Sequence, residues 1–65
     1  MQRSALLRSF RRLERLSQDE LGKKAGIDRS QISRLENGFR RPSPRERIAL
    51  SRVLGVPPEI LFPEV

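Results

Sequence analysis

The 65-residue sequence contains no cysteine and no histidine. Disulfide bonds are therefore excluded, and so is a zinc site built from the usual cysteine and histidine ligands. A chain of this length buries only about 60% of the surface that its unfolded form exposes, so its core is small. The fold has to rest on packing between its secondary-structure elements alone.

Aromatic residues are scarce as well, because the sequence has no tyrosine, no tryptophan and only 3 phenylalanines. RNA-binding surfaces usually stack bases on aromatic side chains, so this composition argues against RNA as the main ligand. The chain also lacks the histidine and cysteine that serve many enzymes as acid, base or nucleophile. We expect no enzymatic activity, no cofactor and no metal ion.

Long apolar runs are absent too. No stretch approaches the roughly 18 residues needed to cross a bilayer, and the N-terminus lacks the apolar segment of a signal peptide. We expect a cytoplasmic protein that uses neither a membrane nor a small-molecule substrate. From Met1 and the number of expected helices we expect one complete small domain, residues 1–65. A fragment of a longer protein is the alternative.

Positive charge, by contrast, is abundant. Lys and Arg together number 14 against 8 Asp and Glu, which gives a net charge of +6. Only Lys23 and Lys24 are lysines, and arginine is better suited than lysine to bidentate contacts with phosphate and guanine. This balance favours a polyanionic partner, nucleic acid first and an anionic membrane surface second. A merely soluble basic domain is the alternative.

Five segments show the 3.6-residue apolar period of helices, and none shows the alternation of a strand. We expect helices over residues 4–15, 17–26, 28–38, 43–55 and 57–63. The apolar side chains expected to face the core are Leu6, Leu7, Phe10, Leu13, Leu16, Leu21, Ala25, Ile32, Leu35, Ile48, Leu50, Val53, Leu54 and Leu61. Ser4 and Ser43 are expected to cap the first and fourth helices. The sequence therefore predicts an all-α domain.

Start and stop signals are clearest in the second and third segments. Ser17 begins a capping box and Gly26 ends the second helix, while Asp28 is the expected N-cap of the third and Gly38 its terminal glycine. A single residue separates Gly26 from Asp28. The two helices are thus joined by a short glycine-containing turn, which is the helix-turn-helix arrangement, over about residues 17–37.

The stretch "LSQDELGKKAGIDRSQISRLENG", followed by "RRPS" and "LGVPPEILF", resembles the Cro and phage-repressor type of helix-turn-helix domain, often called the XRE family. The resemblance covers about residues 7–62 and implies a compact five-helix fold. It also implies a transcriptional regulator, a repressor, that binds double-stranded DNA sequence-specifically. Its third helix would enter the major groove, and a homodimer would bind an inverted-repeat operator. An antitoxin or protein-interaction adaptor with the same fold is the alternative.

The resemblance places the base-contacting side chains on the third helix, at Arg29, Ser30, Gln31, Ser33 and Arg34. On a helical period this polar set lies opposite or beside the apolar pair Ile32 and Leu35. Arg29 and Arg34 can each present a guanidinium fork to O6 and N7 of guanine. The alternative is that both arginines are solvated surface residues.

The resemblance, together with the charge pattern, places the phosphate contacts at Gln18, Asn37, Arg11, Arg40 and Arg41. Gln18 lies near a helix start, where free N–H groups favour an anion, and Asn37 is alternatively a helix-ending residue. Arg40 and Arg41 alternatively form a solvated charge run. In related domains the arginine matching Arg11 pairs with the glutamate matching Glu36 and helps to present a donor to the DNA backbone. Because an unpaired Glu36 would repel phosphate, we expect this salt bridge here.

Three residues depart from the family pattern. Gly22 stands where alanine is usual, Arg15 replaces a common glycine, and Pro57 replaces a common serine cap. We expect position 22 to need a small residue because the third helix packs there, at a loss of about 1 kcal/mol in helix propensity. These departures affect stability rather than the DNA-reading face.

The chain has more apolar side chains than five short helices are expected to bury. Phe39, together with Phe62 or Val65, is expected to contribute to a two-fold interface, since related domains bind paired half-sites about one DNA turn apart. The alternative is that these side chains complete the core.

Overall fold

A computed structural model describes residues 5–63 of the chain. Its helices are α1 (Ala5–Leu13), α2 (Gln18–Ala25), α3 (Arg29–Glu36), α4 (Pro44–Leu54) and α5 (Pro58–Leu61). The predicted all-α, five-helix fold is confirmed, and α2, its turn and α3 form the predicted helix-turn-helix. The Ser4 cap and a role for Val65 in an interface were predicted for positions that lie outside the described residues.

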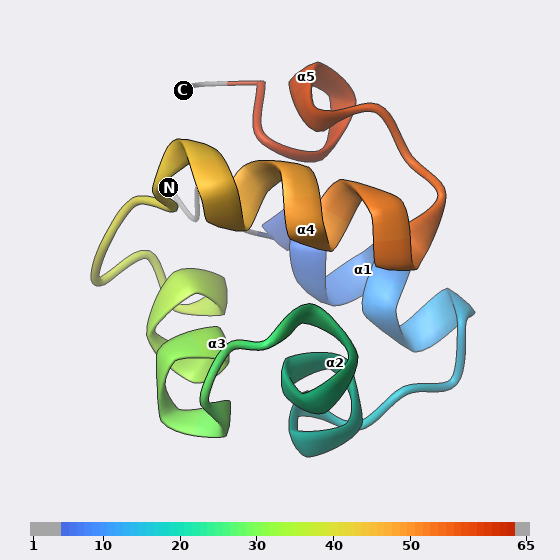
Figure 1. Cartoon of the computed structure of the whole chain (residues 1–65), viewed down its shortest axis with the longest axis vertical. Coiled ribbons are helices and arrows are strands. Elements are labelled where there is room, and N and C mark those ends of the chain that lie inside the picture. Colours follow the sequence, from blue (N-terminus) through green and yellow to red (C-terminus); the bar gives the residue numbers. More distant parts are fainter. Residues whose placement is uncertain (1–4, 64–65) are drawn as a thin grey trace.

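α2 and α3 pack against each other, and α2 also packs against α4. Figure 1 shows α4 crossing the middle of the molecule, with α5 on the side opposite to α2 and α3 and with α1 behind it. Further contacts join α4 to α5 and α1 to α3, so all five helices share one core. Within residues 5–63, no helix combines the length and the apolar character that a membrane span requires.

Capping boxes fix the starts of α2 and α4. The box at Ser17 was predicted, whereas at Ser43 only a cap was predicted. The hydroxyls of Ser17 and Ser43 accept hydrogen bonds from the backbone N–H groups of Glu20 and Glu46. The two glutamate carboxylates in turn accept from the backbone N–H groups of the two serines. Glycines with φ of 73° and 69° end the same two helices. Each N-cap contributes about 1 kcal/mol, so the limits of these helices are set locally.

The buried apolar side chains come from every helix and are Leu7, Leu21, Ile32, Leu35, Leu50, Leu54, Leu61 and Phe62. Phe62 is only 2% exposed, so the prediction that it contributes to a two-fold interface is wrong. It directly follows α5 and, with Leu61, closes the core from that side. Phe39 is 71% exposed and remains available for an interface.

Three side chains expected in the core are exposed instead. Leu6 is 39%, Leu13 73% and Ile48 48% exposed. Residues two apart point to nearly opposite sides of a helix, so Ile48 cannot share the inner side of α4 with Leu50. On α1, the inner side is partly taken by Arg11, which is buried. The side of α1 that faces the core therefore includes the charged Arg11, where an unbroken apolar stripe was predicted.

Arg15, where the family commonly has glycine, adopts a left-handed conformation with φ 57°. This conformation ends α1 and lets the backbone N–H groups of Arg15 and Leu16 donate to the carbonyls of Arg12 and Arg11. Left-handed geometry costs a residue with a Cβ about 1–2 kcal/mol, whereas glycine adopts it freely.

We therefore expect Arg15→Gly to raise the free energy of unfolding by about 0.5–1 kcal/mol, after allowance for the larger freedom of glycine in the unfolded chain. Urea unfolding measures the change. Arg12→Gly removes the same charge from within helical α1 and serves as control, with an expected loss of about 1 kcal/mol. An equal loss in both variants would contradict the assignment of strain to Arg15.

Candidate nucleic-acid interface

The start of α3 is fixed by Asp28, the predicted N-cap. Its carboxylate accepts hydrogen bonds from both the hydroxyl and the backbone N–H of Ser30. These hydrogen bonds lower the pKa of Asp28, so the cap is charged at neutral pH, where it complements the positive end of the helix. The hydroxyl proton of Ser30, a predicted base contact, is therefore donated to Asp28 in the free protein.

One side of α3 is anchored and the other is open to solvent. Ile32 and Leu35 are fully buried and hold the helix against the core. Arg29 and Arg34 are exposed, and Ser33 is half-buried between the two sides. Most of the predicted base-contacting side chains thus share an accessible polar surface that presents two guanidinium groups.

Gln31 occupies a different side of α3 from Ser33. It is half-buried and, with Ile27, Arg45 and Ala49, lines a shallow concavity between the α2–α3 turn and the first turns of α4. Its role as a base contact stays a prediction, and its half-buried location is less favourable for reaching a base than the exposed location of Arg29.

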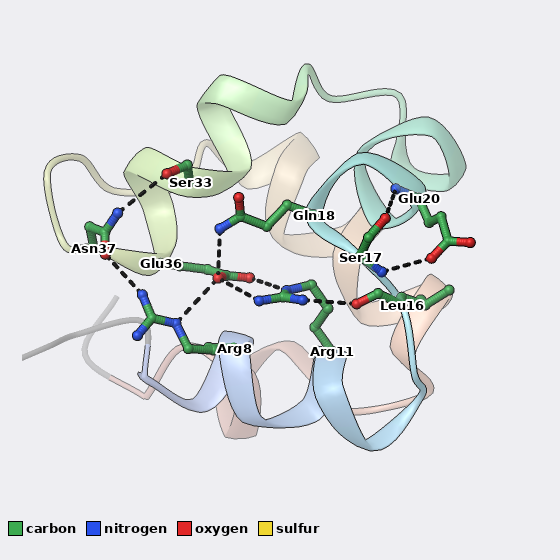
Figure 2. A network of polar contacts seen from close by, with 9 residues as sticks. All are labelled: Arg8, Arg11, Leu16, Ser17, Gln18, Glu20, Ser33, Glu36 and Asn37. Atoms are coloured by element: carbon green, nitrogen blue, oxygen red, sulfur yellow. Dashed lines mark hydrogen bonds and ion pairs between the residues drawn. The ribbon is translucent and has the colours of Figure 1, made fainter.

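Glu36, the last residue of α3, is fully buried although it carries charge. Arg11 of α1 donates to it from Nε at 2.6 Å and from Nη2 at 3.1 Å. The side-chain amide of Gln18, at the start of α2, donates to the same carboxylate at 3.1 Å, and Nε of Arg8 lies 3.4 Å away. Figure 2 shows these side chains converging on Glu36 from α1 and α2. The expected Arg11–Glu36 pair is present.

The protonation of Glu36 reflects a balance of opposed effects. Burial alone raises the pKa of a carboxyl group, but the hydrogen bonds from Arg11 and Gln18 and the positive charges nearby outweigh burial here. The net effect is a lowered pKa, so Glu36 is charged at neutral pH. This charge orients the side chains that surround it.

Arg11, a predicted phosphate contact, is only 8% exposed. Besides its bonds to Glu36, it donates from Nη1 to the backbone carbonyl of Leu16 at 2.8 Å. Its guanidinium group therefore joins α1 to α3 and to the segment that leads into α2. The observed role is structural, and direct contact between Arg11 and a phosphate stays a prediction.

Arg8 was not among the residues predicted from the sequence to lie at the interface. Its Nη2 donates to Oδ1 of Asn37 at 2.8 Å, and Nδ2 of Asn37 donates to the hydroxyl of Ser33 at 3.3 Å (Figure 2). Asn37 is therefore held on both sides. The three-residue spacing of Arg8 and Arg11, which makes them neighbours on α1, is the sequence signal that indicates this placement.

The loop after α3 contains two arginines in different situations. Arg40 is half-buried and binds both carboxylate oxygens of Glu46, at 2.9 and 2.8 Å. This interaction lowers the pKa of Glu46 and raises that of Arg40. Arg41 is exposed. Both predicted phosphate contacts stay predictions, and Arg41 is the more accessible of the two.

Residues 7–61 match the family model of the helix-turn-helix domain. The chain is also similar to the restriction-modification controller protein C.AhdI from Aeromonas hydrophila, with 34% identity and a TM-score of 0.85 over 91% of this chain and 89% of that one. It is similar to the P22 c2 repressor, solved with the synthetic operator 9T, with 27% identity and a TM-score of 0.90 over 95% and 94% of the two chains.

A third similar structure is the clp gene regulator ClgR from Corynebacterium glutamicum, with 26% identity and a TM-score of 0.84 over 94% of this chain and 65% of that one. Comparison with curated proteins gave no match. A family model that spans most of the chain agrees with the arrangement of α2 and α3 and with the exposed polar side of α3. The chain belongs to the helix-turn-helix family, in its Cro and phage-repressor type, and is a DNA-binding regulator of transcription.

Proposed function

We propose that this protein is a sequence-specific repressor that binds an inverted-repeat operator in double-stranded DNA as a homodimer and acts in the cytoplasm. The observation that carries the proposal is the exposed polar side of α3, which presents Arg29 and Arg34 while Ile32 and Leu35 anchor the opposite side. A helix held this way fits the major groove, which is wide enough to admit it.

Base reading is assigned to Arg29 and Arg34, each donating a guanidinium fork to O6 and N7 of a guanine. Ser33 lies beside them on the same helix, and Ser30 offers its acceptor lone pairs. Gln31 is retained as a flanking contact. Contacts of this kind specify sequence, whereas contacts to phosphates fix the register and angle of the helix in the groove.

Phosphate binding is assigned to Gln18, Asn37, Arg11, Arg40 and Arg41. The side-chain amide of Gln18 donates one hydrogen bond to Glu36, and its second N–H is available to an anion at the N-terminus of α2. Arg41 is exposed beside the recognition helix. The net charge of +6 supports the same assignment through long-range attraction to DNA.

A homodimer is proposed because a single short recognition helix reads few bases, and two copies related by a two-fold axis read an inverted repeat. The similar P22 c2 protein is named a repressor and was solved with an operator, and C.AhdI is named a controller protein. Exposed Phe39, in the loop that follows α3, is a candidate for the interface between the two copies.

Selection of bound duplexes from a random DNA pool, followed by titration of the selected duplex across salt, tests the proposal. We expect an enriched inverted repeat with half-sites about one helical turn apart. We also expect affinity to fall with salt, with a slope near −0.9 for each phosphate contacted. Salt-dependent binding without any enriched sequence would contradict sequence-specific regulation and favour a nonspecific role.

Arg34→Ala is expected to relax the preference at one base pair of each half-site, with a loss of about 1–3 kcal/mol of discrimination per half-site. Binding of the mutant to duplexes substituted at each position measures the change. Arg52→Ala, which removes an exposed arginine from the last turn of α4, is the matched control and is expected to leave the base preference unchanged. The same base preference in the Arg34→Ala variant would contradict the assignment.

A further inference from the structure

We propose that Arg8 is a DNA-binding residue whose guanidinium group contacts a backbone phosphate at the junction of α1, α2 and α3. The site would take a phosphodiester of double-stranded DNA, beside Gln18 and Asn37. This inference rests on the proposed DNA binding and adds a contact that neither the sequence pattern nor the family resemblance assigned.

The first support is the charge at this junction. Two guanidinium groups, those of Arg8 and Arg11, face the single carboxylate of Glu36. Arg11 neutralises the carboxylate at 2.6 Å from a buried position, whereas Arg8 is 3.4 Å away and its side chain is 39% exposed. One positive charge therefore remains uncompensated at the surface, and a phosphodiester carries the single negative charge that would balance it.

The second support is the use of the donors on each arginine. Arg11 donates hydrogen bonds from Nε and Nη2 to Glu36 and from Nη1 to the carbonyl of Leu16. Arg8 uses Nε and Nη2, while its Nη1 makes no hydrogen bond with any residue in the described range 5–63. A guanidinium group carries five N–H donors, so Arg8 retains donors at its exposed end.

The third support is the orientation of the neighbouring amides. Arginine only donates hydrogen bonds, so the Asn37 atom that faces Arg8 must be its oxygen, and the amide nitrogen is turned toward Ser33. Glu36 only accepts, so Gln18 must present its amide nitrogen there. In Figure 2, Arg8 lies below Glu36 and Gln18 above it, with Asn37 to one side. Arg8 is thus joined directly to Asn37 and, through Glu36, to Gln18, so the three side chains lie together at this junction.

The test compares wild type with Arg8→Ala and Arg8→Lys in binding to one duplex selected by the wild-type protein, from about 50 to 200 mM salt. Arg8→Ala is expected to weaken binding about tenfold and to reduce the slope of log K against log salt by about 0.9. Arg8→Lys retains the charge and is expected to retain the slope. Arg52→Ala removes an equal charge from the last turn of α4 and is expected to retain it too. Circular dichroism and urea unfolding confirm that each variant is folded.

The outcomes separate this inference from the function on which it rests. Weaker binding by folded Arg8→Ala with an unchanged salt slope would overturn the phosphate contact and leave Arg8 as a residue that only orients Asn37. An unchanged affinity would overturn both roles of Arg8 while the regulator assignment stands. Failure of the wild-type protein to select or bind any duplex would overturn the proposed function and this inference together.

Discussion

Glu36→Ala is expected to lower the free energy of unfolding by about 3–5 kcal/mol, because it leaves a buried arginine without its anion. Arg11 is 8% exposed, so water cannot replace the carboxylate that accepts from its Nε and Nη2. Arg8 is more exposed and can turn to solvent. In a domain with a core this small, the loss is a large fraction of the total stability.

Urea unfolding of Glu36→Ala measures the loss. Glu59→Ala, which removes an exposed carboxylate from α5, is the control and is expected to change stability by no more than about 0.5 kcal/mol. Equal effects in the two variants would show that Glu36 contributes no more than a surface charge.

The same substitution is expected to weaken DNA binding, measured at a temperature where the variant remains folded. Without Glu36, Gln18 and Arg8 lose the acceptor that orients them, and Arg11 no longer fixes α1 against α3. A mobility-shift titration with the selected duplex measures the effect. Tighter binding would identify Glu36 as a charge that merely repels phosphate.

The pH dependence of stability provides a second measurement of this interaction. The pKa of Glu36 is lower in the folded protein than in the unfolded chain, where it is about 4.3. Its contribution is therefore complete above the unfolded pKa and is lost as the pH falls through the lower, folded pKa. Glu36→Gln removes the titrating group, so its stability should fall less than that of wild type when the pH is lowered from about 5 to 3.

Gly22→Val is expected to lower the free energy of unfolding by about 3 kcal/mol, through overpacking between α2 and its turn. Gly22 is buried, and a Cβ built there would lie well inside the contact distance of the carbonyl oxygen of Ile27. The backbone N–H of Ile27 donates to the carbonyl of Gly22 at 2.8 Å, so the turn is tied to α2 and cannot move away freely.

Lys24→Val provides the matched control, because it places valine on the exposed side of the same helix. Its expected loss is about 0.5 kcal/mol, from helix propensity alone. Thermal and urea unfolding of the two variants measure the difference. Similar stabilities would mean that the turn has room for a side chain at position 22.

Position 22 was expected to need a small residue because α3 packs there. The nearest neighbour in the structure is instead the backbone of Ile27, in the turn between α2 and α3.

Local features of this protein followed from the sequence because they depend on residues a few positions apart. Ser17 and Glu20 are three residues apart and form their capping box within one turn, and Asp28 caps α3 through the backbone N–H of Ser30, two residues further on. The buried positions Ile32 and Leu35 obey the helical period, which also leaves Arg29 on an accessible side. Helix order, the helix-turn-helix and the exposed polar side of α3 were therefore predictable.

Contacts between helices were decided only by the tertiary structure. Arg8 and Asn37 are 29 residues apart, and their hydrogen bond depends on how α1 crosses α3, which no local pattern specifies. For the same reason Phe62 is buried in the core, while Leu13 is exposed at the end of its helix. The helical period determines which side of a helix is apolar, and capping determines where the helix begins and ends. Helix crossing determines which side chains fill the space between helices and which remain exposed.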